Sequence, residues 1–398
     1  MIDLFDKHKG IVDRFTRMMQ MGVNAVGVTN DRILSPTRAM INGRETILAG
    51  TNNYMGITMD ADCIKAGQDA MVEFGTGTTG SRVANGSYSL HTELERKLAT
   101  FLNRKHCIVF TTGYQANLGM MSGLAGPKDT IFLDADSHSS IYDGCTLSGA
   151  KLVRFRHNDA TDLDKRMARS EGEEGGRLVV VEGIYSMLGD RSPLADFVEL
   201  KKKHGFQLLA DEAHSFGVLG PHGRGLADEA GLEEDVDFVV GTFSKSVGAI
   251  GGFGAGNHPM FETLRYAMRP YMFTASSSPA AIATALAAIK KLAVEPQRRE
   301  RLRANSARLF DGFRALGLEI GCNVVSPVIA VKCADEVSTI AMWNALLEAG
   351  VYVNIALPPG TPNKLCLLRC SVSAAHTFDD IDRIIGLFRT VVARKAAA

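Results

Sequence analysis

Neither sign of charge is in excess in this chain, because 44 lysines and arginines are balanced by 44 aspartates and glutamates. This balance argues against nucleic acid or an anionic membrane as the main partner. No apolar run approaches the roughly 18 residues that a membrane-spanning helix needs, so we expect no integral membrane segment. Residues 1–9 are charged throughout and lack the apolar stretch of a secretory signal.

Paired cysteines are also missing. The seven cysteines are scattered, odd in number and without any C-x-x-C pair. This argues against a disulfide framework and against a structural zinc site, so we expect no metal. The expected location is the reducing cytoplasm.

At 398 residues the chain is long for a single core, and its pattern divides accordingly. Apolar positions at helical spacing occupy residues 3–21, and short apolar runs alternate with helical patterns from about 105 to 256. Such runs are typical of a mostly parallel sheet with helices on both faces. The runs are 107–110, 130–133, 152–155, 178–181, 208–210, 238–240 and 251–255.

The alternation of short apolar runs and helical patterns stops near residue 285, where a long helical stretch leads to further strand and helix patterns. We therefore expect an α/β protein with a large domain at 55–285 and a smaller α/β C-terminal domain at 286–398. The segment 1–54, a helix followed by strand-like residues, is expected to pack with the small domain.

A lysine follows the mostly apolar run 236–241. Thr242, Phe243, Ser244 and Lys245 come directly after this predicted strand. Burying an ammonium group without a partner is costly, so such a lysine either reaches the surface, its commoner fate, or loses its charge. A Schiff base with an aldehyde cofactor would remove the charge, and the flanking hydroxyls would suit a phosphate. Both interpretations stay open on this segment alone.

Other polar groups also follow predicted strands, at the edge where such sheets bind ligands. Asp211 would hold a pyridine nitrogen protonated, but it could equally cap a helix. His138 could lie flat on an aromatic ring or donate to a reacting carbonyl, although a histidine in this position is more often structural. Gly113 and Tyr114 open a helical pattern whose N–H groups could bind a phosphate; an ordinary strand-to-helix turn is the alternative.

The segment from Gly75 to Gly80 matches the dinucleotide fingerprint G-x-G-x-x-G. That fingerprint requires a strand directly before it, whereas residues 64–74 have a helical pattern. We therefore disfavour a nicotinamide dehydrogenase and expect this loop to let the backbone approach a substrate or a neighbouring subunit.

Five motifs occur in a meaningful order: Gly113-Tyr, Asp136-Ser-His, Glu182-Gly-Ile-Tyr-Ser, Asp211-Glu-Ala-His and Gly241-Thr-Phe-Ser-Lys. This ordered set resembles the α-oxoamine synthases over nearly the whole chain. These enzymes use pyridoxal 5'-phosphate (PLP) to condense an amino acid with an acyl thioester, and they release carbon dioxide. The resemblance implies fold type I of the PLP-dependent transferases, with a mostly parallel seven-stranded sheet in the large domain.

The resemblance also implies roles for individual residues. Lys245 would form the Schiff base and act as the base at the substrate Cα, Asp211 would protonate the pyridine nitrogen, and His214 would bond the ring oxygen. His138 would stack on the ring, orient the substrate carboxylate and assist thioester attack. The phosphate would be held by Gly113, Tyr114, Thr242 and Ser244, with Thr274 and Ser276 reaching across from the other subunit of a homodimer. Ser186 would lie near the cofactor, and Asn53 and Arg369 would bind substrate.

Within the family, the likeness is greatest to bacterial homodimeric enzymes that join L-serine to a long-chain acyl thioester, carried by coenzyme A or acyl carrier protein, to give 3-ketodihydrosphingosine. Two positions depart from one branch of these enzymes: Asn52 replaces a tyrosine, and Leu357 replaces an arginine that helps to hold the substrate carboxylate. The alternatives are 5-aminolevulinate synthase, 8-amino-7-oxononanoate synthase, 2-amino-3-ketobutyrate ligase and a catalytically silent partner subunit.

Overall fold

The computed structural model of the chain describes residues 3–22 and 27–397. It divides into two compact units, one formed by Met1–Thr51 with Arg303–Ala398 and the other by Asn52–Leu302. The second junction falls within α12 (Gln297–Ala315), later than residue 285, where the sequence pattern changes.

The reason is that α11 (Pro279–Val294) packs against α2 (Ala61–Phe74) and α3 (Ser89–Phe101), which belong to the Asn52–Leu302 unit. The helices α2 and α11 approach closely at Gly67, where a Cβ would lie 2.8 Å from the Thr284 hydroxyl.

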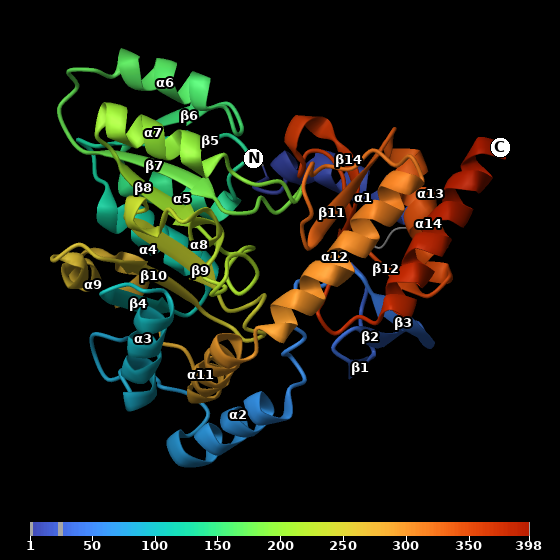
Figure 1. The fold of residues 1–398 in the computed structure, drawn as a ribbon, viewed down its shortest axis with the longest axis horizontal. Helices are drawn as coiled ribbons and strands as arrows, with labels where there is room; N and C mark the ends of the chain where they lie inside the picture. Colours follow the sequence, from blue (N-terminus) through green and yellow to red (C-terminus); the bar gives the residue numbers. More distant parts are fainter. Residues whose placement is uncertain (1–2, 23–26, 398) are drawn as a thin grey trace. The chain divides into compact units, whose positions relative to one another are not determined.

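A seven-stranded sheet forms the centre of the Asn52–Leu302 unit (Figure 1). In space the strands follow the order β4 (His106–Phe110), β10 (Gly252–Gly256), β9 (Phe238–Thr242), β8 (Gln207–Asp211), β7 (Arg177–Glu182), β5 (Thr130–Asp134) and β6 (Lys151–Phe155). Only β10 runs antiparallel to its neighbours, β4 and β9, so six of the seven strands share one direction. The predicted mostly parallel seven-stranded sheet is confirmed.

Both faces of this sheet are buried, which explains the near-continuous apolar runs in the sequence. Alternate residues such as Ile131, Val180 and Val240 form one core with α4 (Gly113–Leu124), α5 (Ser139–Ser148) and the short helices α9 (Leu264–Ala267) and α10 (Arg269–Met272). Successive strand side chains point to opposite faces. The intervening residues lie with α6 (Ala160–Arg169) and α7 (Leu194–His204), where Phe155 contacts Phe197 edge to face.

The unit that contains both chain ends has two smaller sheets. One consists of β1 (Arg32–Ser35), β2 (Arg38–Ile41), β3 (Arg44–Leu48) and β12 (Val351–Tyr352); the other consists of β11 (Val328–Cys333), β14 (Cys366–Ser371) and β13 (Asn354–Ala356). Its helices include α1 (Lys9–Gln20), α13 (Glu336–Glu348) and α14 (Phe378–Ala397). The strand-like run expected from 324 enters the sheet only at Val328, directly after Pro327, which has no N–H group to donate.

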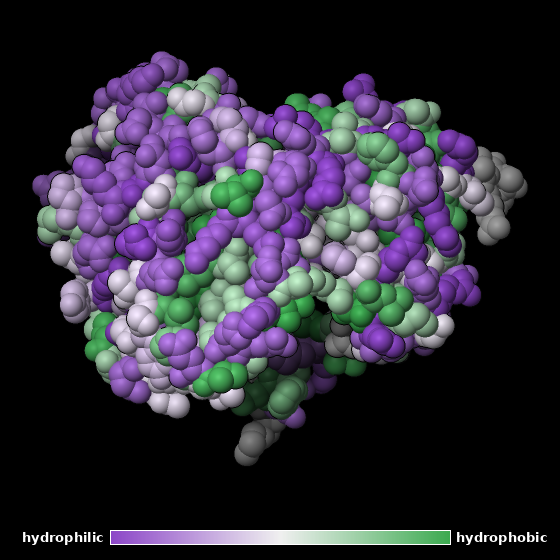
Figure 2. All heavy atoms as spheres, turned by 60° about the horizontal axis from the view of Figure 1, so that its bottom comes forward, coloured by the Kyte–Doolittle hydropathy of each residue, from purple (hydrophilic) through white to green (hydrophobic). Residues whose placement is uncertain are grey.

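The predicted N-terminal helix is present as α1, and its Arg14 pairs with Glu336 of α13. None of its residues is buried, and Ile11 and Phe15 are exposed. The face of the molecule in Figure 2 is mostly hydrophilic, with apolar residues in scattered patches. No helix in the described part of the chain is long and apolar enough to cross a bilayer.

Candidate active site

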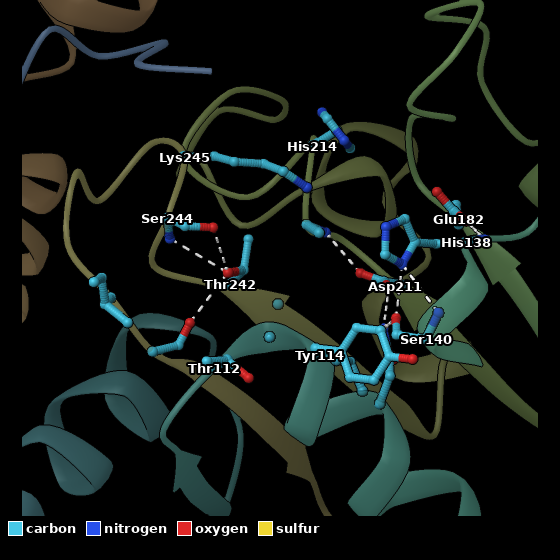
Figure 3. A pocket seen from close by; sticks show the side chains of 17 residues that line it. Thr112, Tyr114, His138, Ser140, Glu182, Asp211, His214, Thr242, Ser244 and Lys245 are labelled. Atoms are coloured by element: carbon cyan, nitrogen blue, oxygen red, sulfur yellow. Dashed lines mark hydrogen bonds between the residues drawn. The ribbon is translucent and has the colours of Figure 1, made fainter. Parts of the chain in front are cut away.

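A cavity of about 290 Å³ lies at the edge of the seven-stranded sheet where the parallel strands end (Figure 3). The end of β7 and the segments that follow β4, β5, β8 and β9 all reach it, as do the two residues that precede the antiparallel strand β10. The lining residues are Thr112, Gly113, Tyr114, Asn117, His138, Ser140, Glu182, Asp211, Ala213, His214, Val240, Gly241, Thr242, Ser244, Lys245, Ile250 and Gly251. The structure therefore brings eight of the sequence-predicted site residues together around one cavity.

Lys245 extends into this cavity from the turn after β9 (Figure 3). The turn is anchored by Phe243, whose side chain is fully buried and stacks on Phe253. The Gly248 N–H donates to the Lys245 carbonyl at 3.0 Å and closes the turn. Because Phe243 points into the core, the side chains of Ser244 and Lys245 are left facing the cavity.

Asp211 ends β8 on the floor of the cavity and is only 3% exposed. Its carboxylate accepts hydrogen bonds from the Asn117 side-chain amide at 2.8 Å and from the Ala213 N–H at 2.9 Å. The turn that follows carries His214, whose Nδ1 lies 2.6 Å from the hydroxyl of the buried Tyr54.

The start of α4 forms an anion-binding corner of the cavity. Thr112 caps this twelve-residue helix by accepting from the Gln115 N–H at 3.1 Å, and the positive end of the helix dipole faces the cavity at Gly113. A Cβ at Gly113 would lie 2.7 Å from the Thr242 side chain, so only glycine fits here. The Thr242 and Ser244 hydroxyls lie 2.9 Å apart on the neighbouring β9 turn.

Two further groups in the cavity lie beside Asp211. His138 precedes α5, and its N–H donates to the Glu182 carboxylate at 2.5 Å. Partial desolvation lowers the pKa of His138 below its ordinary value, and the nearby Lys245 acts in the same direction, while the Asp211 carboxylate opposes the shift. Glu182 ends β7 level with Asp211, and complete burial together with the Asp211 charge raises the pKa of the Glu182 carboxyl well above its usual range.

Other predicted site residues lie outside the lining of this cavity. Ser186 is in the loop after β7, and the buried Asn53 side chain bonds the Ile57 N–H and the Thr58 hydroxyl within its own turn. Thr274 and Ser276 line a separate small recess, which also contains Arg82. The cofactor and substrate roles of these residues remain predictions.

Arg369 lies on β14 of the other unit, where its guanidinium donates to the Ser371 hydroxyl at 3.2 Å. Leu357, the departure noted in the sequence, lines an apolar cavity of about 500 Å³ in the same unit, together with Ile11, Phe15 and Ile355. The substrate-binding role of Arg369 also remains a prediction.

Four residues of the site have no role predicted from the sequence: Asn117, Ser140, Glu182 and Tyr54. Asn117 lies one helical turn after Gly113, and Ser140 lies two residues after His138, so their spacing from predicted site residues was a usable signal. The loop from Gly75 to Gly80 follows α2 directly, so the strand that a dinucleotide fingerprint requires is absent at that point.

The chain is similar to known proteins over nearly its whole length. Residues 45–388 match the family model for aminotransferase class I and II. The chain is 54% identical over 382 residues to the serine palmitoyltransferase of Caulobacter vibrioides, covering 96% of this chain and 94% of that one. It is 38% identical over 352 residues to 8-amino-7-oxononanoate synthase of Anaeromyxobacter sp. (strain K), covering 88% of each. A solved structure of SPT (serine palmitoyltransferase) with a PLP internal aldimine superposes with a TM-score of 0.97 at 47% identity, covering all of both chains.

Proposed function

Because the chain belongs to the aminotransferase class I and II family, we propose that it is a PLP-dependent serine palmitoyltransferase. The reaction is the decarboxylating condensation of L-serine with a long-chain acyl thioester, which gives 3-ketodihydrosphingosine, carbon dioxide and the free thiol. The observation that carries the proposal is the projection of Lys245 into a cavity that also holds the Asp211 carboxylate and the start of α4. Sphingolipid synthesis would begin with this step.

The residues around the cavity fit PLP. The backbone N–H groups at Gly113 and Tyr114 and the Thr242 and Ser244 hydroxyls are donors suited to a phosphate, and the dipole of α4 favours an anion there. Lys245 supplies the amine that attaches the cofactor aldehyde. When bound, PLP draws electrons away from the substrate α-carbon and so permits deprotonation and loss of carbon dioxide.

The side chains of the protein then divide the remaining work. The Asp211 carboxylate, held by Asn117 and the Ala213 N–H at the end of β8, would keep a pyridine nitrogen protonated. His214, fixed by Tyr54, would bond the ring hydroxyl. Lys245 would take and return the proton at the substrate Cα. His138 would cover the ring and orient the substrate carboxylate.

Three further residues are assigned to substrate or cofactor by proposal. Asn53 and Arg369 are proposed to bind the serine substrate, and Ser186 is proposed to lie near the cofactor. The working form is proposed to be a homodimer, in which Thr274 and Ser276 of one subunit reach the phosphate bound to the other. The cytoplasmic location also stays a prediction.

A substrate-pair assay tests this function. The purified chain is given serine, glycine or alanine together with acetyl-, succinyl-, pimeloyl- or palmitoyl-coenzyme A, and thiol release and product mass are measured. We expect turnover with serine and palmitoyl-coenzyme A. Turnover confined to alanine or glycine would instead favour the alternatives: 8-amino-7-oxononanoate synthase, 5-aminolevulinate synthase or 2-amino-3-ketobutyrate ligase.

A matched pair of lysine variants separates an active enzyme from a silent partner subunit. Lys245→Ala is expected to abolish turnover and the borohydride-sensitive visible absorbance, because the amine that attaches the cofactor is gone. Lys202→Ala, on the exposed face of α7, should leave both unchanged. A wild-type chain that is colourless and inactive after incubation with PLP would overturn the proposal.

A further inference from the structure

His138 caps α5 with its own imidazole ring. The Ser140 N–H donates to Nδ1 of His138 at 3.2 Å, the position normally taken by the oxygen of a serine, threonine, aspartate or asparagine. A backbone N–H group can only donate a hydrogen bond. Nδ1 of His138 must therefore be an acceptor and carries no proton.

The Ser140 hydroxyl is directed at the same nitrogen, 2.8 Å away. This hydroxyl accepts from the Asn117 side-chain amide at 3.0 Å, and among its hydrogen bonds in the described part of the chain Nδ1 of His138 is the one acceptor for its own proton. Ser140 is only 1% exposed. Two donors from one residue thus converge on a single ring nitrogen.

Asn117 sets the direction of this chain of hydrogen bonds. Its amide group donates one proton to Ser140 and the other to the Asp211 carboxylate, at 2.8 Å. Because a carboxylate can only accept, turning the amide around would place an oxygen against the Asp211 charge. The amide oxygen of Asn117 is buried without a hydrogen-bond partner, which costs free energy. The reversed orientation would cost more, because it would also lose the hydrogen bond to Asp211.

We propose that Asn117 and Ser140 are positioning residues that fix His138 as the neutral tautomer with its proton on Nε2. The proposal rests on the proposed function for the use of this proton: Nε2–H is a hydrogen-bond donor for the substrate carboxylate or the thioester carbonyl. In this state His138 has no free lone pair on the ring and is not a general base, which leaves the proton at Cα to Lys245.

The surroundings of the ring agree with a neutral imidazole. The charged and titratable groups that face it are Asp211 from β8, Glu182 from β7, Asp143 on α5 and Lys245 after β9. Desolvation and Lys245 lower the pKa of His138. The Glu182 carboxylate also holds the His138 N–H, so the backbone and the ring are each fixed by a separate partner.

The tautomer can be observed directly by NMR of the full-length protein labelled with ¹⁵N at its ten histidines, both without added cofactor and loaded with PLP. Loss of signals in His138→Gln assigns the residue. We expect long-range ¹H–¹⁵N correlations of a neutral ring protonated at Nε2. This tautomer should be favoured over the other by about tenfold or more, since each of the two hydrogen bonds to Nδ1 contributes about fivefold. A ring protonated at Nδ1, or a charged ring at pH 7, would overturn the proposal without any variant being needed.

Variants then test the two positioning residues. Ser140→Ala and Asn117→Ala should each raise the population of the Nδ1-protonated tautomer about fivefold and lower kcat/KM for the acyl thioester about tenfold. Ser140→Thr keeps the hydroxyl and should retain the wild-type values of both. Ser139→Ala, on the neighbouring exposed position, is the matched control and should change neither. Unchanged tautomer populations in both variants, with melting temperatures that show folded protein, would refute the roles of Asn117 and Ser140.

The failure of this inference and the failure of the proposed function are distinguishable. The NMR measurement needs no substrate. If the expected tautomer is found in a chain without serine-dependent turnover, the proposed function is refuted and the inference about His138 is kept. Turnover with serine and palmitoyl-coenzyme A by a chain whose His138 is protonated at Nδ1 would do the reverse.

Discussion

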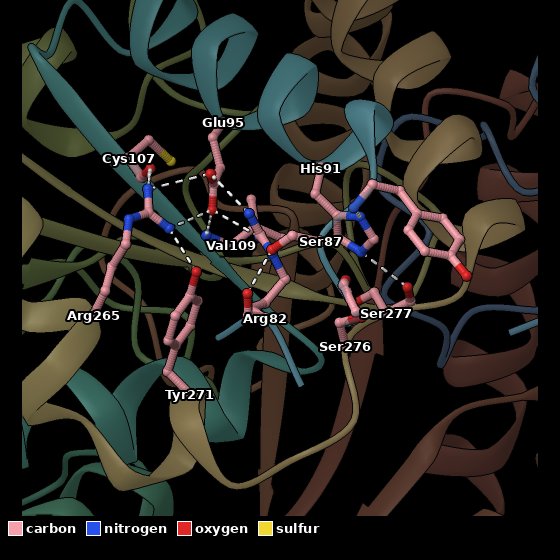
Figure 4. Close-up of polar contacts among 12 residues, drawn as sticks. Arg82, Ser87, His91, Glu95, Cys107, Val109, Arg265, Tyr271, Ser276 and Ser277 are labelled. Carbon is pink, nitrogen blue, oxygen red and sulfur yellow. Dashed lines mark hydrogen bonds and ion pairs between the residues drawn. The ribbon is translucent and has the colours of Figure 1, made fainter. Parts of the chain in front are cut away.

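Replacement of Glu95 by glutamine should strongly destabilise the Asn52–Leu302 unit. Glu95 lies on α3 with its side chain 9% exposed, and its two oxygens accept four hydrogen bonds from Arg82 and Arg265 at 2.9–3.3 Å (Figure 4). One oxygen also accepts from the Val109 N–H of β4 at 3.0 Å. A single carboxylate therefore joins α3, β4, the loop that carries Arg82 and the segment that carries Arg265.

The expected cost is about 3–5 kcal/mol, the usual penalty for removing one member of a buried charge cluster. Glutamine keeps the shape and one acceptor but removes the charge that the Arg82 and Arg265 guanidinium groups share, with side chains 8% and 19% exposed. Among the described residues, Arg265 then keeps only its ion pair with the more exposed Glu262. Tyr271 gives only partial compensation, since it already accepts from Arg265 and lies beside both arginines. The assay is urea unfolding, with Glu93→Gln as the control, because Glu93 is a half-exposed glutamate on the same helix whose ion pair, with Lys290, is long at 3.9 Å.

The pH dependence gives a second readout. Burial alone would raise the pKa of Glu95, but Arg82 and Arg265 outweigh it and hold the pKa below its ordinary value. A carboxyl with a depressed folded-state pKa adds stability above its unfolded pKa of about 4.3, and this contribution is lost as the pH falls through the folded value. The wild-type chain should therefore lose stability in acid more steeply than Glu95→Gln. A destabilisation below 1 kcal/mol at pH 7, or parallel acid profiles, would refute this reasoning.

Two further perturbations test the supports of the site. Gly113→Ala should weaken PLP binding at least tenfold, measured by absorbance titration. The added Cβ would lie 2.7 Å from the Thr242 side chain and would push this side chain away from the start of α4, where the phosphate is proposed to bind. His157→Gln should cost roughly 3 kcal/mol, since the ring lies between the Asp134 and Asp190 carboxylates. Although burial opposes it, these partners raise the pKa of His157 to about 10. The stability that a raised pKa adds is complete below pH 6.5 and lost as the pH rises to about 10, so urea midpoints of wild type and variant should converge over that interval.

The sheet was predictable from the sequence because its strands are buried on both faces and leave apolar runs that no amphipathic helix imitates. The second domain was harder to delimit. The helical pattern that begins near 285 belongs to α11, and only tertiary packing at Gly67 assigns this helix to the Asn52–Leu302 unit. Hydrophobic periodicity identifies a helix but does not show against which core its apolar face packs. A domain boundary cannot be placed at that point from periodicity alone.

The same distinction separates the site residues that were predicted from those that were not. Asp211 ends a strand and Lys245 and His138 each follow one, and the parallel direction of those strands is enough to bring the three to one edge. Asn117 and Ser140 lie inside helices, where asparagine and serine are ordinary residues, and their importance arises from two hydrogen bonds with a fixed direction. Sequence patterns predict where a residue lies along a helix or strand. The direction of a hydrogen bond depends instead on which of the contacting groups can only donate and which can only accept. The position of His138 after β5 therefore does not by itself define its chemistry. In the proposed arrangement, the location of its ring proton depends on the Ser140 N–H and on the Asn117 amide, whose orientation is fixed by Asp211.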